Sequence, residues 1–209
     1  MIRHLVFDMG NVLIHYDPAV FMDRLGVPEE DRPLLAREVF GSVEWVRLDR
    51  GTVGQEEALA SMEKRLPQRL RGYARRLVCA WWEDGPLLPM EGMAELLAEL
   101  KGLGYGIYLL SNATVHQPDY FPRIPGSQFF DGGVVSAQWR LLKPERAIYE
   151  TLFREYRLDP AECFFVDDLN INVEGALCAG MAGAVFHGDV GELRQVLRQA
   201  GVPVETGQN

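Results

Sequence analysis

Three short apolar runs in this chain each end abruptly in polar residues. They span residues 4–7 before Asp8, 107–110 before Ser111 and Asn112, and 163–166 before Asp167 and Asp168. Apolar runs without alternation are typical of strands that are buried on both faces of a parallel sheet. The sequence therefore predicts three central strands, each of which delivers polar side chains at its carboxyl end.

The segments around these runs predict helices between the strands. Helical patterns cover residues 91–101, 145–156, 170–180 and 191–200, and weaker strand patterns cover 134–135 and 184–186. Pro144 fits the first position of the helix over 145–156, because a helix start needs no hydrogen bond from that nitrogen. Strands that alternate with helices predict an α/β fold, with a mainly parallel sheet and right-handed crossovers.

One long stretch interrupts this alternation. Residues 15–85 contain helical patterns at 18–25, 29–40, 55–66 and 69–82 and no convincing strand, and the turn at 84–86 predicts the exit of this stretch. We expect an all-helical insertion after the first strand, large enough to form a small cap domain. The predicted domains are a Rossmann-like core at 1–14 and 86–209 and a helical cap at 15–85.

Composition excludes several functional classes. The chain has 209 residues, of which 47% are hydrophobic, and a formal net charge of −9. That charge argues against a general nucleic-acid binder, and no run approaches the roughly 18 apolar residues of a membrane span. Cys79, Cys163 and Cys178 are few and widely spaced, which predicts buried, reduced thiols in a cytoplasmic protein. We expect a monomer or a weak homodimer that binds neither nucleic acid nor membranes.

The polar residues at the strand ends are the candidates for chemistry. Ligands of open parallel sheets collect beyond the carboxyl ends of the strands, so these distant segments are expected to meet in one crevice. Asp8, which enters a Gly-Asn turn, is either a carboxylate nucleophile that forms an aspartyl-phosphate or the start of a turn. Asp167 and Asp168 are either Mg²⁺ ligands or a charge pair that stabilises the following helix, and the two interpretations are compatible.

Three further residues have a functional and a simpler interpretation. Lys143 is one of only three lysines, and it either neutralises a phosphate or the acidic cluster or is a solvated surface lysine. Ser111 and Asn112 either donate hydrogen bonds to a phosphoryl oxygen or act as ordinary polar residues at a strand end.

Four short motifs, taken together, resemble those of a known family. Residues 7–12, 110–112, 143–144 and 166–168, in this order and spacing, resemble the four motifs of the haloacid dehalogenase-like (HAD) hydrolase superfamily. The helical insertion resembles the C1 cap of its subfamily IA. The start at 8–12 and the stretch 167–176 resemble the bacterial α-D-glucose-1-phosphate phosphatase-like branch.

The resemblance implies a Mg²⁺-dependent phosphomonoester hydrolase of small phosphorylated metabolites, such as a hexose 1-phosphate. Asp8 would attack phosphorus, and Lys143 would orient Asp8 and bind the phosphoryl group. The implied Mg²⁺ ligands are Asp8, the Gly10 carbonyl and Asp168, with Asp167 either coordinating directly or supporting from behind. The implied substrate-binding residues of the core are Asn11, Ser111, Asn112 and Lys143.

Gly10 departs from the family pattern. Most phosphatases of the superfamily carry a second aspartate at this position, which acts as general acid and base, and losing such a group costs about 10²–10⁴-fold in rate. His15 and Asp17 are candidates to replace it, or ordinary hinge residues. Two alternatives to a phosphatase follow: a 2-haloacid dehalogenase-type hydrolase, and a catalytically weak member with a binding or regulatory role. The acidic pair at 167–168 favours the phosphatase.

The predicted cap offers one candidate segment for substrate selection. In residues 43–47, Trp45 would pack against a sugar and Arg47 would bind its polar groups. The alternative is that Trp45 belongs to the core of the cap and Arg47 is a solvated surface residue.

Overall fold

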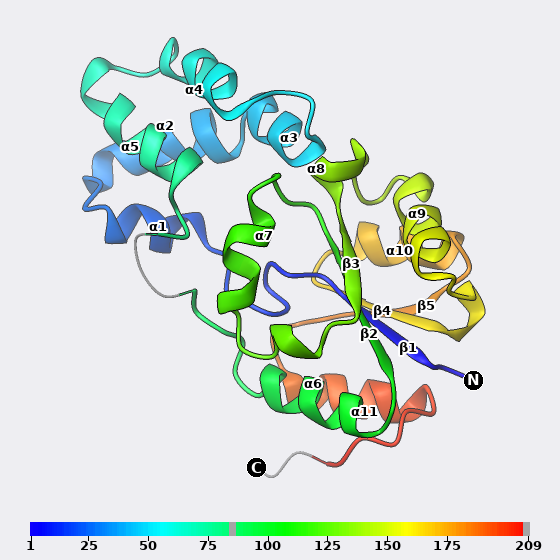
Figure 1. Ribbon diagram of the computed structural model, residues 1–209. Coiled ribbons are helices and arrows are strands. Elements are labelled where there is room, and N and C mark those ends of the chain that lie inside the picture. The colour runs from blue at the N-terminus through cyan, green and yellow to red at the C-terminus, as the bar shows by residue number, and fades with distance from the viewer. Residues whose placement is uncertain (84–86, 207–209) are drawn as a thin grey trace.

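The computed structural model describes residues 1–83 and 87–206 and contains one five-stranded sheet (Figure 1). All of its strand pairs are parallel, in the order β3-β2-β1-β4-β5. The strands are β1 His4–Phe7, β2 Gly106–Ser111, β3 Gly132–Val135, β4 Cys163–Asp167 and β5 Ala182–Val185. The predicted α/β fold is confirmed, and the central position of β1 places Asp8 in the middle of the carboxyl edge.

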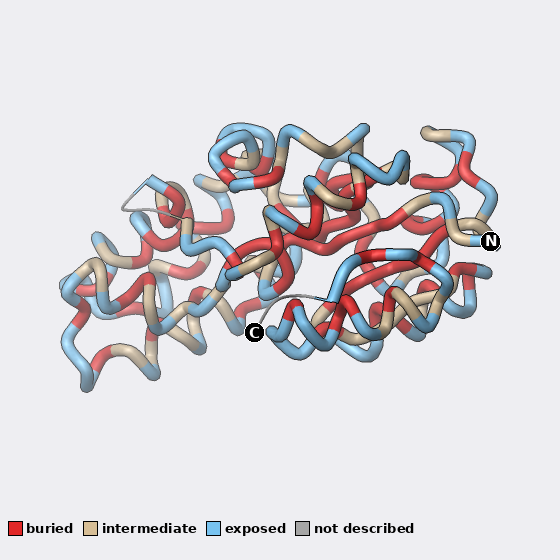
Figure 2. The backbone as a smooth tube through the Cα atoms, turned by 90° about the horizontal axis from the view of Figure 1, so that it is seen from below, coloured by how far each residue is buried: buried red, intermediate tan, exposed pale blue. Residues whose placement is uncertain are grey.

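Helices cover both faces of the sheet, because successive side chains of a strand point to opposite faces. Leu5 and Phe7 pack in the cluster that contains the apolar residues of α6 (Met93–Gly102) and α11 (Val190–Gln199). Val6 packs instead with α9 (Arg146–Tyr156) and α10 (Asn170–Cys178). Figure 2 shows the buried strands between these two layers, whose outer surfaces are exposed.

The connections between the strands contain short helices. They are α7 Gln117–Tyr120, the 3-10 turns Phe121–Arg123 and Ser127–Phe129, α8 Ser136–Trp139 and the 3-10 turn Pro160–Glu162. The placement of Pro144 at the first helical position is wrong: α9 begins at Arg146 with Glu145 as its N-cap, and Pro144 precedes the helix after a cis peptide bond to Lys143.

The insertion after β1 is helical, as predicted, and lies over the carboxyl edge of the sheet (Figure 1). We call residues 15–83 the helical segment. Its helices are α1 Pro18–Arg24, a 3-10 turn Glu29–Asp31, α2 Arg32–Leu35, a π-helical turn Ala36–Phe40, α3 Val43–Arg50, α4 Gln55–Glu63 and α5 Gln68–Cys79.

Helix α3 was not predicted, because its apolar residues do not follow a helical stripe. Val43 and Val46 are exposed, whereas Glu44 and Leu48 are buried. Its ends nevertheless carry helix signals: Ser42 Oγ accepts a hydrogen bond from Trp45 N at 3.2 Å, and Gly51 ends the helix with a positive φ of 71°.

The chain enters and leaves the helical segment side by side, where an isolated antiparallel bridge pairs Ile14 with Pro89. His15 N donates to Leu88 O at 2.8 Å, and Met90 N donates to Leu13 O at 2.9 Å. The predicted exit turn at 84–86, and with it the boundary at 85/86, lies outside the described residues. The division into core and cap domains therefore stays a prediction.

Two expectations from composition can be compared with the structure. Within residues 1–83 and 87–206, no helix combines the length and the hydropathy needed to cross a membrane. The three cysteines are free, but the prediction that all are buried is wrong: Cys163 is buried, Cys79 is half-buried and Cys178 is exposed. Cys178 lies on the outer side of α10, where Glu174 of the preceding turn is its hydrogen-bond partner.

Candidate active site

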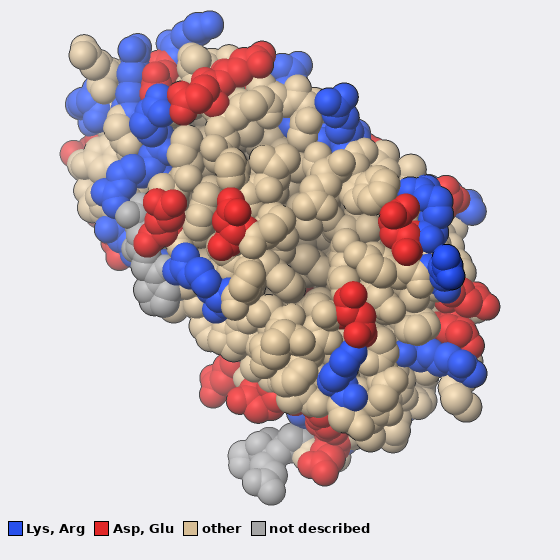
Figure 3. All heavy atoms as spheres, in the orientation of Figure 1, with Lys and Arg blue, Asp and Glu red and all other residues tan. Residues whose placement is uncertain are grey.

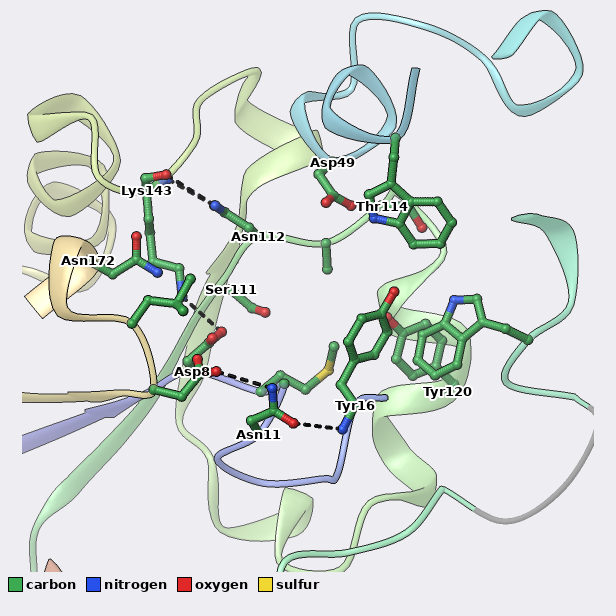
Figure 4. A pocket seen from close by; sticks show the side chains of 17 residues that line it. Asp8, Asn11, Tyr16, Asp49, Ser111, Asn112, Thr114, Tyr120, Lys143 and Asn172 are labelled. Atoms are coloured by element: carbon green, nitrogen blue, oxygen red, sulfur yellow. Dashed lines mark hydrogen bonds and ion pairs between the residues drawn. The ribbon is translucent and has the colours of Figure 1, made fainter. Parts of the chain in front are cut away.

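A cavity of about 290 Å³ lies between the carboxyl edge of the sheet and the helical segment. Figure 3 shows that the hollow on this face is bordered mainly by uncharged residues. The side of the cavity formed by the sheet edge, which we call the floor, includes Asp8, Ser111, Lys143 and Asp168. The opposite side, which we call the wall, includes Tyr16, Trp45, Asp49 and Trp81 of the helical segment. The predicted convergence of the strand ends is therefore present (Figure 4).

Lys143 joins the first and the last acidic segments. Its Nζ lies 2.9 Å from Asp8 Oδ1 and 2.6 Å from Asp167 Oδ2, and only 1% of its side chain is exposed. A buried ammonium needs such partners, because its desolvation is otherwise costly. The alternative of a solvated surface lysine is therefore wrong.

Asn112 holds the backbone of Lys143 rather than reaching into the cavity. Its Oδ1 accepts a hydrogen bond from Lys143 N at 2.8 Å, and its Nδ2 donates to Lys143 O at 3.2 Å (Figure 4). Both ends of the amide are thus engaged with one residue. Asn112 lines the cavity, but its side chain is placed to orient Lys143 instead of a substrate.

The two adjacent aspartates have different environments. Asp167 is fully buried, and its carboxylate accepts hydrogen bonds from Leu169 N at 2.8 Å and from Asn172 Nδ2 at 3.0 and 3.1 Å, besides the contact with Lys143. Asp168 is half-buried and lines the cavity. Of the acidic pair, Asp168 is therefore the residue with oxygens open to a ligand.

Asn11 positions Asp168 from the turn after β1. Its Nδ2 donates to Asp168 Oδ2 at 3.1 Å, and its Oδ1 accepts a hydrogen bond from Tyr16 N at 3.0 Å. The backbone of Asn11 has a φ of 53°, in the left-handed region that asparagine enters more readily than most residues. Asn11 therefore lies at the cavity, as predicted, with its side chain committed to the floor.

The floor carries excess negative charge. Oxygens of Asp8, Asp167 and Asp168 all lie within 4.8 Å of one another, and three carboxylates face the single positive charge of Lys143. Asp8 Oδ1 is also buried without a hydrogen bond of good geometry. Hard oxygen donors with an uncompensated charge suit a divalent cation such as Mg²⁺, so the residues present fit this ion.

For Asp8, Lys143 and Asp168 of the floor, burial and the neighbouring charges or hydrogen bonds shift the pKa in opposite directions. Burial raises the pKa of Asp8, although the positive charge of Lys143 opposes the shift. Burial lowers the pKa of Lys143, but the charges of Asp8 and Asp167 outweigh it and hold that pKa above its usual value. Burial also raises the pKa of Asp168, against the hydrogen bond from Asn11. Lys143 is therefore charged at neutral pH.

Ser111 and Gly10 complete the floor. Ser111 is 1% exposed and lines the cavity, and its hydroxyl has no hydrogen-bond partner within the described part of the chain, which leaves it available to a ligand. Gly10 lines the cavity too, and a Cβ built on it would meet only Tyr16, at an ordinary contact distance of 3.6 Å. Space does not require glycine at this position.

Aromatic rings form most of the wall. Tyr16, Trp45, Trp81 and Tyr120 line the cavity, and Trp81 contacts both tyrosines edge-on with ring centroids 5.4 and 5.2 Å apart. Trp45 also packs against Phe40, with ring centroids 4.8 Å apart, so it belongs to the core of the helical segment as well as to the cavity lining, and its packing against a sugar stays a prediction.

Other residues predicted for this wall lie elsewhere. Arg47 is exposed and does not line the cavity, which fits the alternative of a surface residue. His15 and Asp17 are also exposed and outside the cavity, and Asp17 Oδ1 accepts a hydrogen bond from Ala19 N at 2.8 Å as the N-cap of α1.

Asp49 was missed by the sequence analysis. It lies on the unpredicted helix α3 and lines the cavity across from Asp8 (Figure 4). Burial, and secondarily the charge of Asp8, raises the pKa of Asp49 to about 8. The capping signals at Ser42 and Gly51 could have identified α3, but no local signal shows which face of that helix meets the sheet edge.

Several known proteins are similar to this chain in sequence or in fold. A sesquiterpene phosphatase of Aspergillus oryzae is 28% identical over 85% of this chain and 86% of its own length. A HAD family enzyme of Bacteroides thetaiotaomicron, solved in complex with magnesium and inorganic phosphate, is 20% identical, with a TM-score of 0.70 over 92% of this chain and 99% of its own. The L-2-haloacid dehalogenase of Xanthobacter autotrophicus is 18% identical, with a TM-score of 0.65 over 94% and 83%.

The two solved structures show that the fold is shared. The family itself follows from the sequence, because the family model described as haloacid dehalogenase-like hydrolase matches residues 2–180, which include every floor residue described above. The resemblance found in the four motifs is thereby confirmed: the chain belongs to the haloacid dehalogenase-like hydrolases.

Proposed function

We propose that the protein is a Mg²⁺-dependent phosphomonoester hydrolase that works through an aspartyl-phosphate on Asp8. One observation carries the proposal: the Asp8 carboxylate, in contact with the buried ammonium of Lys143, faces a cavity in which two more aspartates stand close by. A nucleophilic carboxylate needs positive charge around it to approach a phosphate dianion, and this floor has places for two cations.

The oxygen donors of the floor that remain open to a ligand indicate which residues would hold Mg²⁺. Asp8, Asp168 and the Gly10 carbonyl would hold Mg²⁺, while Asp167, whose oxygens are already engaged by Lys143, Leu169 and Asn172, would support the site from behind. When bound, the ion neutralises the charge that builds up on the phosphoryl oxygens. The Mg²⁺ and phosphate of the Bacteroides thetaiotaomicron enzyme support this choice.

The residues of the floor divide the reaction between them. Asp8 attacks phosphorus, the bond from phosphorus to the leaving oxygen breaks, and Lys143 and Ser111 hold the transferred group by its oxygens. Water then attacks the aspartyl-phosphate and releases inorganic phosphate, which restores the carboxylate. Lys143 serves in both steps because it contacts Asp8 and remains charged.

We propose a small phosphorylated metabolite as the substrate, and sugar phosphates such as a hexose 1-phosphate are the first candidates. The aromatic wall favours a second candidate, the phosphate ester of an apolar alcohol, because four rings line the cavity and the Aspergillus oryzae relative is a sesquiterpene phosphatase. A C1 cap and the glucose-1-phosphate branch, a monomer or weak homodimer without nucleic-acid or membrane partners, and a cytoplasmic location all remain expectations.

The test is a panel of sugar, prenyl and aryl phosphates, assayed with Mg²⁺ and after its removal by a chelator. We expect turnover that requires Mg²⁺ and is lost by a factor on the order of 10⁴ or more in Asp8→Asn, because the amide fills the same space but cannot attack phosphorus. The circular dichroism spectrum of this variant should match the unchanged protein.

Three results would contradict the proposal. Turnover retained in Asp8→Asn would refute the nucleophile. Chelator-insensitive release of halide from 2-haloacids would favour the dehalogenase instead. Binding of Mg²⁺ and phosphate without turnover on any ester would favour the regulatory alternative.

A further inference from the structure

The floor contains no group placed to protonate a leaving group. Gly10 offers no side chain, Lys143 is occupied by two carboxylates, and Asp8 and Asp168 are assigned to phosphorus and the ion. No histidine lines the cavity within the described residues. A leaving alkoxide therefore needs its proton from another wall of the cavity.

Asp49 is the remaining acid among the residues that line the cavity. Within the described residues, its carboxylate forms no hydrogen bond and no ion pair, although burial makes an unpartnered carboxylate costly. Figure 4 shows it on the wall, opposite Asp8, with the open cavity between them. The leaving group of a substrate bound at Asp8 would extend toward this wall.

The core holds the backbone of Asp49 in place. Ser136 Oγ of α8 donates a hydrogen bond to Asp49 O, and the neighbouring Arg50 forms an ion pair with Glu145. Gly51 comes so close to α8 that an added Cβ would lie 2.1 Å from Ala137 O. The C-terminal end of α3 is thereby fastened to the core, so Asp49 is a fixed part of the cavity.

The surroundings of Asp49 favour its neutral form. Among the described residues, five other titratable side chains line the cavity with Asp49. Asp8, Asp168 and Lys143 belong to the floor, and Tyr16 and Tyr120 belong to the aromatic part of the lining. Burial is the larger cause, and the charge of Asp8 the smaller, of a pKa of about 8. A carboxyl group with that pKa is mostly protonated at neutral pH and can donate a proton.

We propose that Asp49 is the general acid and base of this enzyme, in place of the side chain that Gly10 lacks. As the bond between phosphorus and the leaving oxygen breaks, the Asp49 carboxyl gives its proton to that oxygen, and the product departs as a neutral alcohol. The resulting carboxylate then takes a proton from the water that attacks the aspartyl-phosphate. Asp49 is thereby reprotonated, and the cycle closes.

This inference rests on the proposed function, and its main test compares two ester classes. Alkyl phosphates need a proton on the leaving oxygen, whereas p-nitrophenyl phosphate does not. In Asp49→Asn we expect kcat/KM for alkyl phosphates to fall by about 10²–10⁴-fold and that for p-nitrophenyl phosphate by less than about tenfold, because kcat/KM reports the step in which the leaving group departs and not the later hydrolysis of the aspartyl-phosphate. Asp17→Asn is the matched control: it makes the same change in the helical segment, outside the cavity, and asparagine still caps α1.

A second variant tests the same role by rescue. Gly10→Asp should restore alkyl phosphate turnover in the Asp49→Asn background by more than it raises the turnover of the unchanged protein, because only the former lacks a proton donor. The contact of 3.6 Å to Tyr16 leaves space for the new side chain. Equal gains in the two backgrounds would overturn the proposal.

The unchanged protein offers a third measurement, which does not depend on the folding of a variant. Because the protonated form of Asp49 is the active one in the first step, kcat/KM for alkyl phosphates should be at its maximum below a pH of about 8 and decline above it. The same decline should be weaker for p-nitrophenyl phosphate. An identical alkaline decline for both esters would overturn the proposal.

The outcomes separate this inference from the proposed function. If Asp8→Asn abolishes turnover while Asp49→Asn lowers kcat/KM equally for both ester classes, or for neither, the proposed phosphatase function stands and the proposed role of Asp49 is wrong. If Asp8→Asn retains full turnover, the proposed phosphatase function is wrong, and the proposed role of Asp49, which rests on it, is wrong as well.

Discussion

The floor and the wall of the cavity are built in opposite ways. On the floor, Lys143, Asp167 and Asn172 are buried and joined to one another by several polar contacts each. On the wall, Trp45 and Trp81 contribute aromatic surface, and the one acidic residue, Asp49, forms no hydrogen bond or ion pair with the described residues. The floor is a network of charged and hydrogen-bonded side chains, whereas the wall is a mainly aromatic surface with a single carboxyl group among its described residues, that of Asp49.

The comparison suggests a division of labour. Polar networks at low dielectric hold charges in place, which suits the stabilisation of a transferring phosphoryl group. An aromatic surface binds the rest of a substrate without determining the reaction. Changes to the floor should therefore alter turnover and stability together, whereas changes to the aromatic residues of the wall should alter substrate affinity.

Of the three variants that compare the floor with the aromatic wall, Lys143→Met should have the largest effect. Removing the cation leaves Asp8 and Asp167 buried without it, so the free energy of unfolding should fall by about 3–5 kcal/mol and turnover by on the order of 10²–10³-fold. Urea unfolding and steady-state kinetics measure the two effects. The matched control is Lys101→Met, which breaks a half-exposed pair with Asp131 and should cost at most about 1 kcal/mol. Similar losses of stability and turnover in the two variants would contradict the conclusion that the buried contacts of Lys143 hold the floor together.

A smaller effect is expected from Asn172→Ala. This change removes both hydrogen bonds from the amide of Asn172 to Asp167. Because a supporting residue orients the metal ligands rather than reacting, turnover and Mg²⁺ affinity should both fall by about 10–100-fold. Titration of turnover with Mg²⁺ separates the two quantities. Asn170→Ala, an exposed position in the first turn of the same helix, should change neither. If Mg²⁺ affinity stayed unchanged in Asn172→Ala, Asn172 would have no part in the site.

The smallest effect is expected on the wall, from Trp45→Ala. Loss of one ring should raise KM by a few-fold to about tenfold and leave kcat nearly unchanged, in line with about 0.5–1.5 kcal/mol for an aromatic contact. Arg47→Ala, two residues away but exposed and outside the cavity, should change KM by less than about twofold. A larger effect from Arg47 than from Trp45 would reverse the assignment of this wall.

The sheet could be predicted because its signal is local. Residues 4–7 and 163–166 are continuous apolar runs, and burial on both faces demands this pattern wherever the strand lies in the sheet. The polar residues after the runs follow the same logic, since the carboxyl ends of parallel strands share one edge. The sequence alone therefore predicts that Asp8, Ser111 and Asp168 lie together, and the structure confirms it.

The wall could not be predicted in this way. Helix α3 buries Glu44 beside Leu48 and exposes Val43, so its pattern does not show which side is inside. Arg47 and Asp49 are two residues apart, which places them on different faces of a helix. Helix α3 packs on α8 through Gly51, and this packing places Asp49, rather than Arg47, at the cavity.

The sequence by itself determined the layered fold, the family and the acids at the strand ends, because apolar runs and short motifs are properties of neighbouring residues. The tertiary structure decided the rest: that Lys143 is buried between Asp8 and Asp167, that Asn112 serves Lys143, and that Asp49 stands opposite the nucleophile. These relations join residues far apart in the chain, and such contacts depend on how whole elements pack, which no local pattern encodes.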